Sequence, residues 1–580
     1  MAFQISPGVN FTEKDITLIV PAVATSPAAI VCPFVWGPAE KPIIVSNEAE
    51  LLEMFGAPKN DGYYAKFWFT ASNFLAYGNN LKVVRAVNAS DLNAASPAFS
   101  GAVVTGKQIK NVDHYRSMSF LSSSTDAVFY AAYPGELGNS LSVVVIDNGG
   151  YAPSDGTPDV IDYADYVKVV GQIPGTSQFS IDKGNATSKD EIHILIIDKG
   201  GLWSGTKGTV LEKFEFLSKA SNGLNEDGTP SYYRTVINNQ SEYVWVGYKA
   251  GSNWDTPITD TSAAFGNVDS SNFFKLYSLT GGTLHASGGI SDAAISAAYT
   301  THYSNSEEID IGMLIAGPLN ASSANSIVQL AQTRRDCMAF VSPTISYEKT
   351  TAEKLTEVLT YRSSLTSSSY GVMDTGYKTQ YDKYNDVYRS VPLCADIAGC
   401  CARTDNLQDP WWSPAGFARG TILNSIKLDY NPNKTHRDEL YKQGINPVVS
   451  FDGTGTVLYG DKTLLQKPSA FDRINVRRLF IVLEKAIAKA SQFVLFEFND
   501  EFTRSQFSLL VEPYLKTVLG RRGISDYRVV CDSTNNTSQV IDSNNFVADI
   551  YIKPNRSINF VQLNFIATPS GISFDEVVGN

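Results

Sequence analysis

The chain is 580 residues long, so roughly two to four domains are expected, because a single hydrophobic core stops growing well below this length. Its net charge of -12 argues against nucleic acid or an anionic membrane surface as the main partner. No apolar run reaches the roughly 18 residues of a membrane helix, and no basic segment precedes an apolar one near residue 1. We therefore predict no membrane insertion and no secretion signal.

Residues 1–22 are predicted to form an extended N-terminal arm rather than a domain. Short segments of alternating apolar and polar residues are interrupted by a turn at Pro7 and Gly8. None of these segments is long enough to be stable alone. The arm therefore either pairs with its own domain or adds a strand to a neighbouring subunit. Its candidate contact residues are Phe3, Ile5, Val9 and Phe11.

An α/β pattern follows the arm. Strands are expected at 28–35, 43–45 and 81–87, and helices at 46–56 and 68–77. The pattern resumes after residue 285, with helices expected at 293–299, 326–336 and 355–365 and strands at 309–315 and 338–341. We expect residues 23–90 and 285–377 to form one middle α/β domain, from which the intervening segment is looped out.

Residues 91–284 have a different composition, in which short apolar runs are separated by Ser, Asn, Gly and Asp. Strands are expected at 143–146, 166–170, 192–197 and 243–247. This pattern predicts a predominantly β insertion of one or two subdomains. Proteins that decorate a particle surface have a similar composition, so a receptor-binding or other surface protein stays open as an alternative.

The C-terminal part is predicted to be α+β. Apolar residues at helical spacing predict helices at 474–490 and 507–518, the second kinked or split at Pro513. Strands are expected at 493–498 and 527–531. Of the paired Arg477 and Arg478 in the first helix, we expect one side chain to point sideways and the other outward.

The end of the chain repeats the character of its start. Residues 546–552 and 558–566 alternate between apolar and polar side chains, and residues 568–580 are predicted to form a C-terminal arm. Such segments are not stable alone and require a partner sheet. The candidate contact residues of this arm are Ile572, Phe574, Val577 and Val578.

No catalytic motif is visible. The chain lacks GxxxxGK[ST] and GxGxxG, and its five histidines are far apart and lack an HExxH context. Cys394, Cys400 and Cys401 are close in sequence but lack CxxC spacing or a nearby histidine, so we predict buried thiols rather than metal ligands. We expect no enzyme, no metal and no cofactor. An envelope polysaccharide hydrolase needs two carboxylates facing each other across a cleft, which the sequence leaves open as a further alternative.

Four groups of residues carry a family resemblance. The first contains Ser6–Val9, Phe34–Pro38 and Asn73–Gly78, and the second is the YPGELGN motif that ends at Asn139. The remaining two groups lie at 382–388, 396–405, 411–416, 444–447, 459–463 and 475–478. Through these motifs the chain resembles the contractile-tail sheath proteins of T4-type bacteriophages.

The resemblance implies a structural subunit of a helical homopolymer, stacked as six-fold discs around a tail tube and standing on a baseplate. It implies an inner assembly domain, residues 378–567, which the N-terminal arm joins, with the middle domain and the β insertion further out. Terminal arms would insert into sheets of neighbouring subunits and keep them linked while contraction drives the tube through the host envelope for genome ejection. A tail terminator is a further implied partner, and the implied location is the virion after assembly in the host cytoplasm.

A tube contact is expected at the end of the second C-terminal helix, at Lys516, Arg521 and Arg522. Contacts between charges give register at modest affinity, which suits a surface that must release its partner. The alternative is an ordinary solvated helix end whose cations offset the helix dipole.

Overall fold

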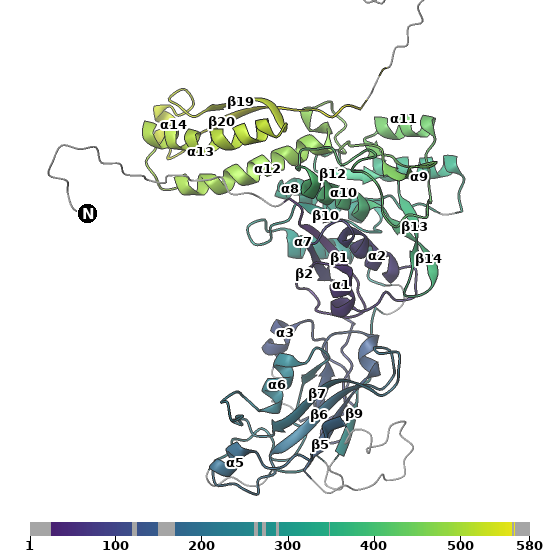
Figure 1. The fold of residues 1–580 in the computed structure, drawn as a ribbon, viewed down its shortest axis with the longest axis vertical. Helices are drawn as coiled ribbons and strands as arrows, with labels where there is room; N and C mark the ends of the chain where they lie inside the picture. Colours follow the sequence, from purple (N-terminus) through teal and green to yellow (C-terminus); the bar gives the residue numbers. More distant parts are fainter. Residues whose placement is uncertain are drawn as a thin grey trace, which may run out of the picture.

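The computed structural model describes residues 25–118, 124–148, 169–259, 265–268, 274–285, 289–346, 348–559 and 562. These residues form a mixed α/β structure in three parts (Figure 1). A central α/β body lies between the β-rich insertion at the bottom of the view and a helical unit with a two-stranded sheet at the top.

The body is organised around a seven-stranded sheet with the order β16-β12-β11-β10-β1-β3-β2. All neighbouring pairs are parallel except β2–β3. The central strand β1 is buried at every residue, as expected of a parallel strand covered on both faces. The strands are β1 (Ala28–Cys32), β2 (Ile43–Val45), β3 (Leu81–Arg85), β10 (Met313–Ile315), β11 (Met338–Val341), β12 (Gly371–Asp374) and β16 (Ile445–Asn446).

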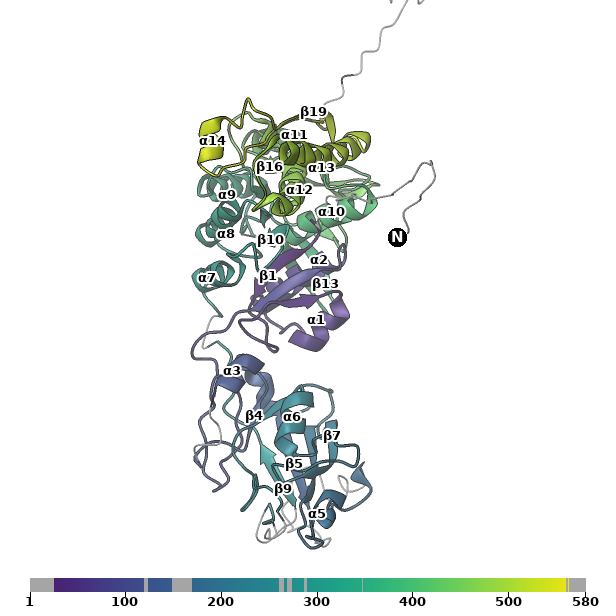
Figure 2. The ribbon, with the colours of Figure 1, turned by 90° about the vertical axis from the view of Figure 1, so that its left-hand side faces the viewer.

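Helices cover both faces of this sheet (Figure 2). One layer contains α1 (Glu48–Phe55), α2 (Tyr64–Leu75) and α10 (Cys394–Leu407), and the other contains α7 (Asp292–Tyr303), α8 (Ala321–Arg334) and α9 (Thr351–Ser363). Sequence signals fix their ends: Asn47 caps the start of α1, Gly56 ends it with φ 77°, and Thr350 and Glu353 form a capping box at α9. The α/β pattern expected for the body is present.

Smaller elements complete the body. A three-stranded antiparallel sheet contains β13 (Tyr377–Asp382), β14 (Val387–Pro392) and β15 (Lys427–Leu428). Helix α11 (Lys434–Lys442) and the hairpin of β17 (Val448–Phe451) and β18 (Gly455–Leu458) follow.

The insertion has its own hydrophobic core. Its main sheet has the order β7-β6-β5-β9, from Thr209–Ser218, Glu191–Asp198, Leu141–Asp147 and Phe274–Ser278. The insertion also contains a short antiparallel pair, β4 (Phe129–Ala131) and β8 (Val244–Val246). Its helical elements are α3 (Val112–Ser117), α5 (Gln178–Asp182), α6 (Tyr233–Gln240) and the η2 turn (Glu136–Ser140). A strand is predicted at 166–170, of which the structure describes only Val169 and Val170. These two residues are helical, so the prediction is wrong for them, and residues 166–168 lie outside the described residues.

Two buried polar groups connect the body to the insertion. Arg85, at the end of β3, donates to the carbonyl oxygens of Phe34, Val35, Gly37 and Pro134 at distances of 2.5–3.3 Å. Asp91 and His285 lie on the two connections between body and insertion, and their side chains approach to 2.6 Å with no exposed surface. The guanidinium group of Arg85 therefore connects the first residues after β1 to the insertion.

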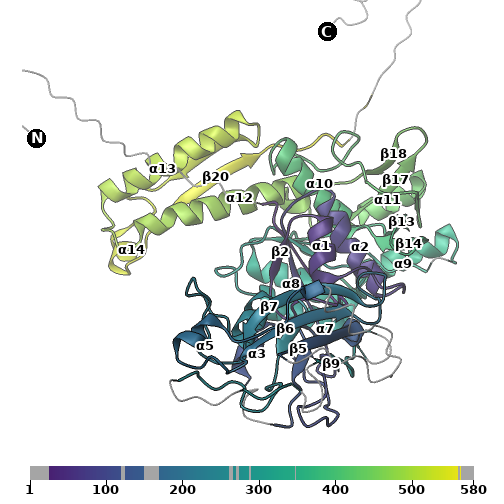
Figure 3. The same cartoon turned by 60° about the horizontal axis from the view of Figure 1, so that its bottom comes forward.

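The C-terminal unit projects sideways from the body (Figure 3). Helices α12 (Ile474–Ser491) and α13 (Glu501–Gly520) pack with β19 (Ile524–Val530) and β20 (Asp549–Pro554) around Leu479, Leu483, Phe507, Val511 and Leu515. Helix α13 contains Pro513 and is not split by it, so that part of the prediction is wrong. A short helix, α14 (Ser538–Asp542), lies between the two strands in sequence.

The strand predicted at 493–498 is also wrong. The chain forms a single η4 turn (Gln492–Val494) and then an irregular connection to α13. The short apolar run at these positions predicts a strand, but no neighbouring strand pairs with this segment within the described structure.

Candidate assembly interface

The residues predicted to join subunits lie in the two arms. Phe3, Ile5, Val9, Phe11, Ile572, Phe574, Val577 and Val578 all lie outside the described residues. The structure instead shows how the chain is held at described residues close to each arm, three residues after the N-terminal arm and 9 to 11 residues before the C-terminal arm. We call these points the N-terminal root, at Thr25, and the C-terminal root, at Ser557 and Asn559.

The N-terminal root is bound to two helices. Thr25 donates a hydrogen bond of 2.8 Å to the carboxylate of Asp405 on α10. The same carboxylate oxygen accepts a hydrogen bond of 2.5 Å from Arg478 on α12, which also donates to the carbonyl of Cys401 at 3.3 Å. A buried arginine paired with a carboxylate is costly to disturb, because removing either partner leaves an uncompensated charge. The root is therefore fixed to the packed interior.

These contacts correct the expectation for the arginine pair. Both side chains are buried, with Arg477 6% and Arg478 4% exposed. The Arg477 guanidinium lies over the rings of Phe471 and Tyr370, with 3.9 Å and 4.4 Å to the ring centroids. Neither arginine points outward, because α12 packs against the body along its first turns.

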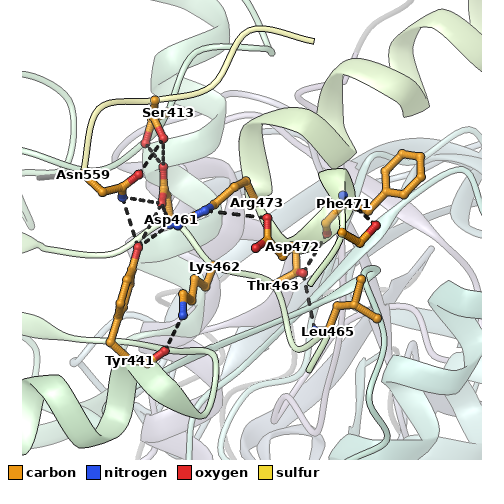
Figure 4. A network of polar contacts seen from close by, with 12 residues as sticks. Ser413, Tyr441, Asp461, Lys462, Thr463, Leu465, Phe471, Asp472, Arg473 and Asn559 are labelled. Carbon is orange, nitrogen blue, oxygen red and sulfur yellow. Dashed lines mark hydrogen bonds and ion pairs between the residues drawn. The ribbon is translucent and has the colours of Figure 1, made fainter. Parts of the chain in front are cut away.

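The C-terminal root is held by Asp461, which lies between β18 and α12 (Figure 4). Its carboxylate accepts hydrogen bonds from Ser557 (2.6 Å), Ser413 and Arg473 (each 2.9 Å), and Asn559 (3.0 Å). Its backbone carbonyl accepts the first amide of α12 at 2.8 Å. One residue thus joins the end of the described chain to the start of α12.

Tyr441 of α11 completes this network. Its hydroxyl accepts hydrogen bonds from Arg473 and, at 3.0 Å, from Asn559. Lys462 lies over the Tyr441 ring and donates to its carbonyl at 2.7 Å. The network orients the chain at Asn559 from two sides.

The electrostatics of Asp461 follow from these contacts. Burial alone would raise its pKa, but hydrogen bonds from Ser557 and Asn559 and the charge of Arg473 hold the pKa below its usual range. Asp461 is therefore ionised at neutral pH, as a carboxylate that accepts this many hydrogen bonds must be.

The two roots converge on one element. Arg473 is the residue that precedes the first turn of α12, and Arg478 lies five positions later on the same helix. Five helical residues span about 7.5 Å along the axis. The beginning of α12 therefore lies at both roots.

The sheet β19–β20 is a candidate acceptor for added strands. The two strands are antiparallel, and within the described residues neither has a second neighbour. Tyr527, Val529, Ile550 and Ile552 pack against the apolar cluster of α12 and α13. The sheet thus has one covered face and two open edges, which is the arrangement that strand addition uses.

A second surface feature lies at the tip of the α12–α13 hairpin. Phe496 is fully exposed and has a positive φ of 70°, which is uncommon for a bulky residue. We define the tip patch as the exposed residues Phe493, Leu495, Phe496, Phe498 and Phe502. So many neighbouring exposed apolar side chains are typical of an interaction surface.

The predicted tube-contact residues lie close together at the end of α13. Lys516 is exposed. Arg521 forms an ion pair of 2.7 Å with Asp409, and Arg522 lies over the ring of Trp412 at 5.6 Å. Two of the three cations thus already have intramolecular contacts, whereas Lys516 has neither an ion pair nor a ring contact among the described residues.

The described residues contain no group of three or more His, Cys, Asp or Glu residues that could hold a metal ion. All six cysteines are free and buried, and burial raises the pKa of Cys394 and Cys401 to about 12, which disfavours the reactive thiolate. Among the described helices, none is both long and apolar enough to cross a bilayer.

Comparison with known families gives a consistent result. Residues 292–464 match the phage tail sheath protein central domain, and residues 466–568 match the phage tail sheath C-terminal domain. Residues 25–86 match the N-terminal region of domain III of the tail sheath protein Gp18. The first two matched regions meet between Leu464 and Gln466, just before the start of α12.

Relatives match along the whole chain. The tail sheath protein of Vibrio phage KVP40 is 33% identical over 99% of this chain and 100% of its own length. That of Enterobacteria phage T4 is 32% identical over 99% of both chains. The sheath tail protein of Listeria innocua is 13% identical and shares the fold with a TM-score of 0.52, over 92% of this chain and 96% of the other. The chain belongs to the phage tail sheath protein family.

Proposed function

We propose that this chain is the structural subunit of a contractile sheath, which polymerises helically around a phage tail tube and contracts to drive the tube through the host envelope for genome ejection. The observation that carries the proposal is the match of more than 30% identity to tail sheath proteins along essentially the entire chain. The protein would act in the virion, as a six-fold helical homopolymer assembled in the host cytoplasm, in contact with a baseplate, a tube protein and a tail terminator.

Linkage between subunits would come from strand exchange. The N-terminal arm of one copy and the C-terminal arm of another would add to the open edges of β19–β20 in a third. Backbone hydrogen bonds in a shared sheet need not break when the rigid bodies reorient, so the polymer would stay connected during contraction. A head-to-tail contact that does not close on itself generates a helix, as a sheath requires.

The energy for contraction would be stored in assembly. We propose a metastable extended polymer whose subunits gain interface area on contraction, so that no nucleotide, cofactor or enzymatic step is needed. The domain division that accompanies this proposal is an inner unit (378–567 with the N-terminal arm), a middle α/β domain (23–90 and 285–377) and an outer insertion (91–284). The matched family regions 292–464 and 466–568 meet near the start of α12, which lies inside this proposed inner unit and not at its boundary at residue 378.

Electron microscopy of the purified chain tests the function, because a sheath subunit forms hollow tubes with a helical repeat. A receptor-binding protein or a polysaccharide hydrolase would give discrete particles instead, and release of sugar from envelope polysaccharide would support the hydrolase.

Strand exchange is tested by changing the arms without shortening the chain. Replacing Phe3, Ile5, Val9 and Phe11 with serine should give a folded monomer that no longer polymerises, and so should removing residues 568–580. A matched control is Val103→Ser, which changes an apolar residue that is 90% exposed in the insertion. Long sheaths formed by the arm variants would show that the arms are not the links.

The tube contact is tested most cleanly at Lys516. Replacing Arg521 with glutamate would also place a second carboxylate beside Asp409. Lys516→Glu, in contrast, reverses the charge of a residue that has no described ion pair. We expect Lys516→Glu to reduce assembly on tubes while the soluble fold persists, and Lys183→Glu in the insertion to have no effect. Equal sheath formation by both variants would remove Lys516 from the contact.

A further inference from the structure

A large pocket lies where the insertion meets the body. Its volume is about 1140 Å³. Its body wall contains α1 and the residues after β1, and its other wall contains the η2 turn, the loop at Trp203 and the end of α6. Helix α1 lies at the end of the body that faces the insertion (Figure 1). None of the contacts proposed for sheath assembly uses this pocket.

Aromatic rings line the pocket and hold one another in place. Trp36 packs edge to face with Trp203 and Tyr133, with centroid distances of 4.8 Å and 5.3 Å. Trp203 packs in the same way with Tyr243 at 5.1 Å, and its backbone amide donates to Asp198 at 2.8 Å. The faces of such rings carry partial negative charge and attract organic cations.

The charged residues of the pocket are mostly acidic. Its lining includes the carboxylates of Glu50, Glu53, Glu136 and Glu242, but Lys59 is the only lysine or arginine among these lining residues. Lys59 already pairs with Glu136 at 3.1 Å. No lysine or arginine of the described structure forms an ion pair with Glu53 or Glu242. The pocket therefore has an unbalanced negative charge.

The pKa values of Tyr243 and Glu212 are shifted at this pocket. Burial, followed by the carboxylates of Glu212, Glu242 and Glu53, raises the pKa of Tyr243. Burial also raises the pKa of Glu212, whose Oε2 atom is buried without a hydrogen-bond partner. Carboxylates from both walls thus act on the same ring.

We propose that this pocket binds a small organic cation that carries more than one ammonium group. The aromatic rings would contact its methylene groups and charges, while Glu53 of α1 and Glu242 of the insertion would pair with separate ammonium groups. A metal ion fits the site less well, because no described cluster of carboxylates converges to ligate one. A cation bound here would connect the insertion to the body.

The test is calorimetric titration of the full-length chain with spermidine. We expect saturable binding that weakens as salt is added, because the partner carboxylates are largely at the surface. Magnesium ions, which lack an apolar chain, and the neutral sugar maltotriose should not compete. Absence of saturable binding at millimolar spermidine, or full competition by maltotriose, would overturn the proposal.

Variants localise the binding. Glu53 and Glu242 are exposed, so the double variant Glu53→Gln, Glu242→Gln should fold normally and bind spermidine about tenfold more weakly, as expected for two lost surface ion pairs. Glu226→Gln removes an exposed glutamate of the insertion outside the pocket and should leave the affinity unchanged. Equal losses in the two variants would indicate adsorption to an acidic surface and would reject the pocket. Because the readout is small-molecule binding, its failure would leave the assembly proposal untouched.

Discussion

Ser557 and Asp461 are 96 residues apart in sequence, and the Ser557 hydroxyl donates a hydrogen bond of 2.6 Å to the Asp461 carboxylate. This contact fixes the chain 11 residues before the predicted C-terminal arm. It belongs to a network in which one ionised carboxylate accepts hydrogen bonds from five side chains, those of Ser413, Tyr441, Arg473, Ser557 and Asn559.

Replacement of Asp461 by asparagine should loosen the C-terminal root. The change leaves Arg473 with only its longer ion pair of 3.7 Å to Asp472 and turns an amide group toward donors, so the free energy of unfolding should fall by about 2–4 kcal/mol. Urea denaturation measures the loss, and hydrogen exchange should show faster exchange near Ser557. Asp452→Asn, at an exposed position, is the matched control and should change stability little. Unchanged stability in Asp461→Asn would mean that the network does not hold the root.

The Asp461 contribution should also depend on pH. Because its folded pKa lies below its unfolded value, the stabilisation is present above the unfolded pKa, near 4, and disappears as pH falls through the folded pKa. The stability difference between the wild-type chain and Asp461→Asn should therefore shrink on acidification. A difference that stays constant down to pH 2 would contradict the assignment.

Asp374 should behave in the opposite way. Burial raises its pKa to about 8, although Ser342 and the Gly376 amide donate hydrogen bonds to it. Between about pH 4 and 8 the unfolded chain has lost this proton and the folded chain retains it, so stability falls as pH rises. The slope from this group is at most about 1.4 kcal/mol per pH unit. Asp374→Asn should flatten it, as measured by denaturation at several pH values; an identical slope in both proteins would place the titration elsewhere.

Arg85 should not tolerate lysine. Its guanidinium donates to four carbonyl oxygens in fixed directions, and the single ammonium group of lysine cannot reach all of them. We expect Arg85→Lys to lower the free energy of unfolding by about 3 kcal/mol, because buried carbonyls lose their donors. Limited proteolysis should then cut more rapidly between body and insertion. Arg528→Lys, at an exposed position, is the control, and equal proteolysis of both variants would refute the role of Arg85.

The tip patch should contribute nothing to the stability of the free subunit. Phe496→Gly removes a fully exposed side chain and relieves a left-handed backbone conformation, which offsets the entropy cost of glycine. The free energy of unfolding should stay within about 0.5 kcal/mol. Phe507→Ala, in contrast, removes a core residue that is 3% exposed and should cost about 3–5 kcal/mol. A large loss in Phe496→Gly would mean that the tip packs against its own chain.

Local sequence signals predicted helices and strands well where the apolar residues of the expected pattern pack into a core. The stripe that includes Leu479 and Leu483 faces a core as expected, and Asn47 and Gly56 mark the ends of α1. The strand predicted at Phe493–Phe498 is wrong, because a short apolar run cannot reveal whether a neighbouring strand is available to pair with it.

Long-range contacts were beyond sequence reasoning. The sequence predicts that one of Arg477 and Arg478 points outward, yet both are buried, and Arg478 pairs with Asp405, which lies 73 residues earlier in the chain. The residues around Asp461 come from positions between Ser413 and Asn559, and no short motif unites them. The contact residues predicted in the arms lie outside the described structure, so those assignments stay predictions.

The convergence of both roots on the first turns of α12 has a mechanical consequence. If the arms link subunits as proposed, tension applied through either arm would reach the subunit at positions a few residues apart on one helix and would pass from one neighbour to the next along a short path. The insertion lies at the other end of the body from α12, so it would carry little of that tension.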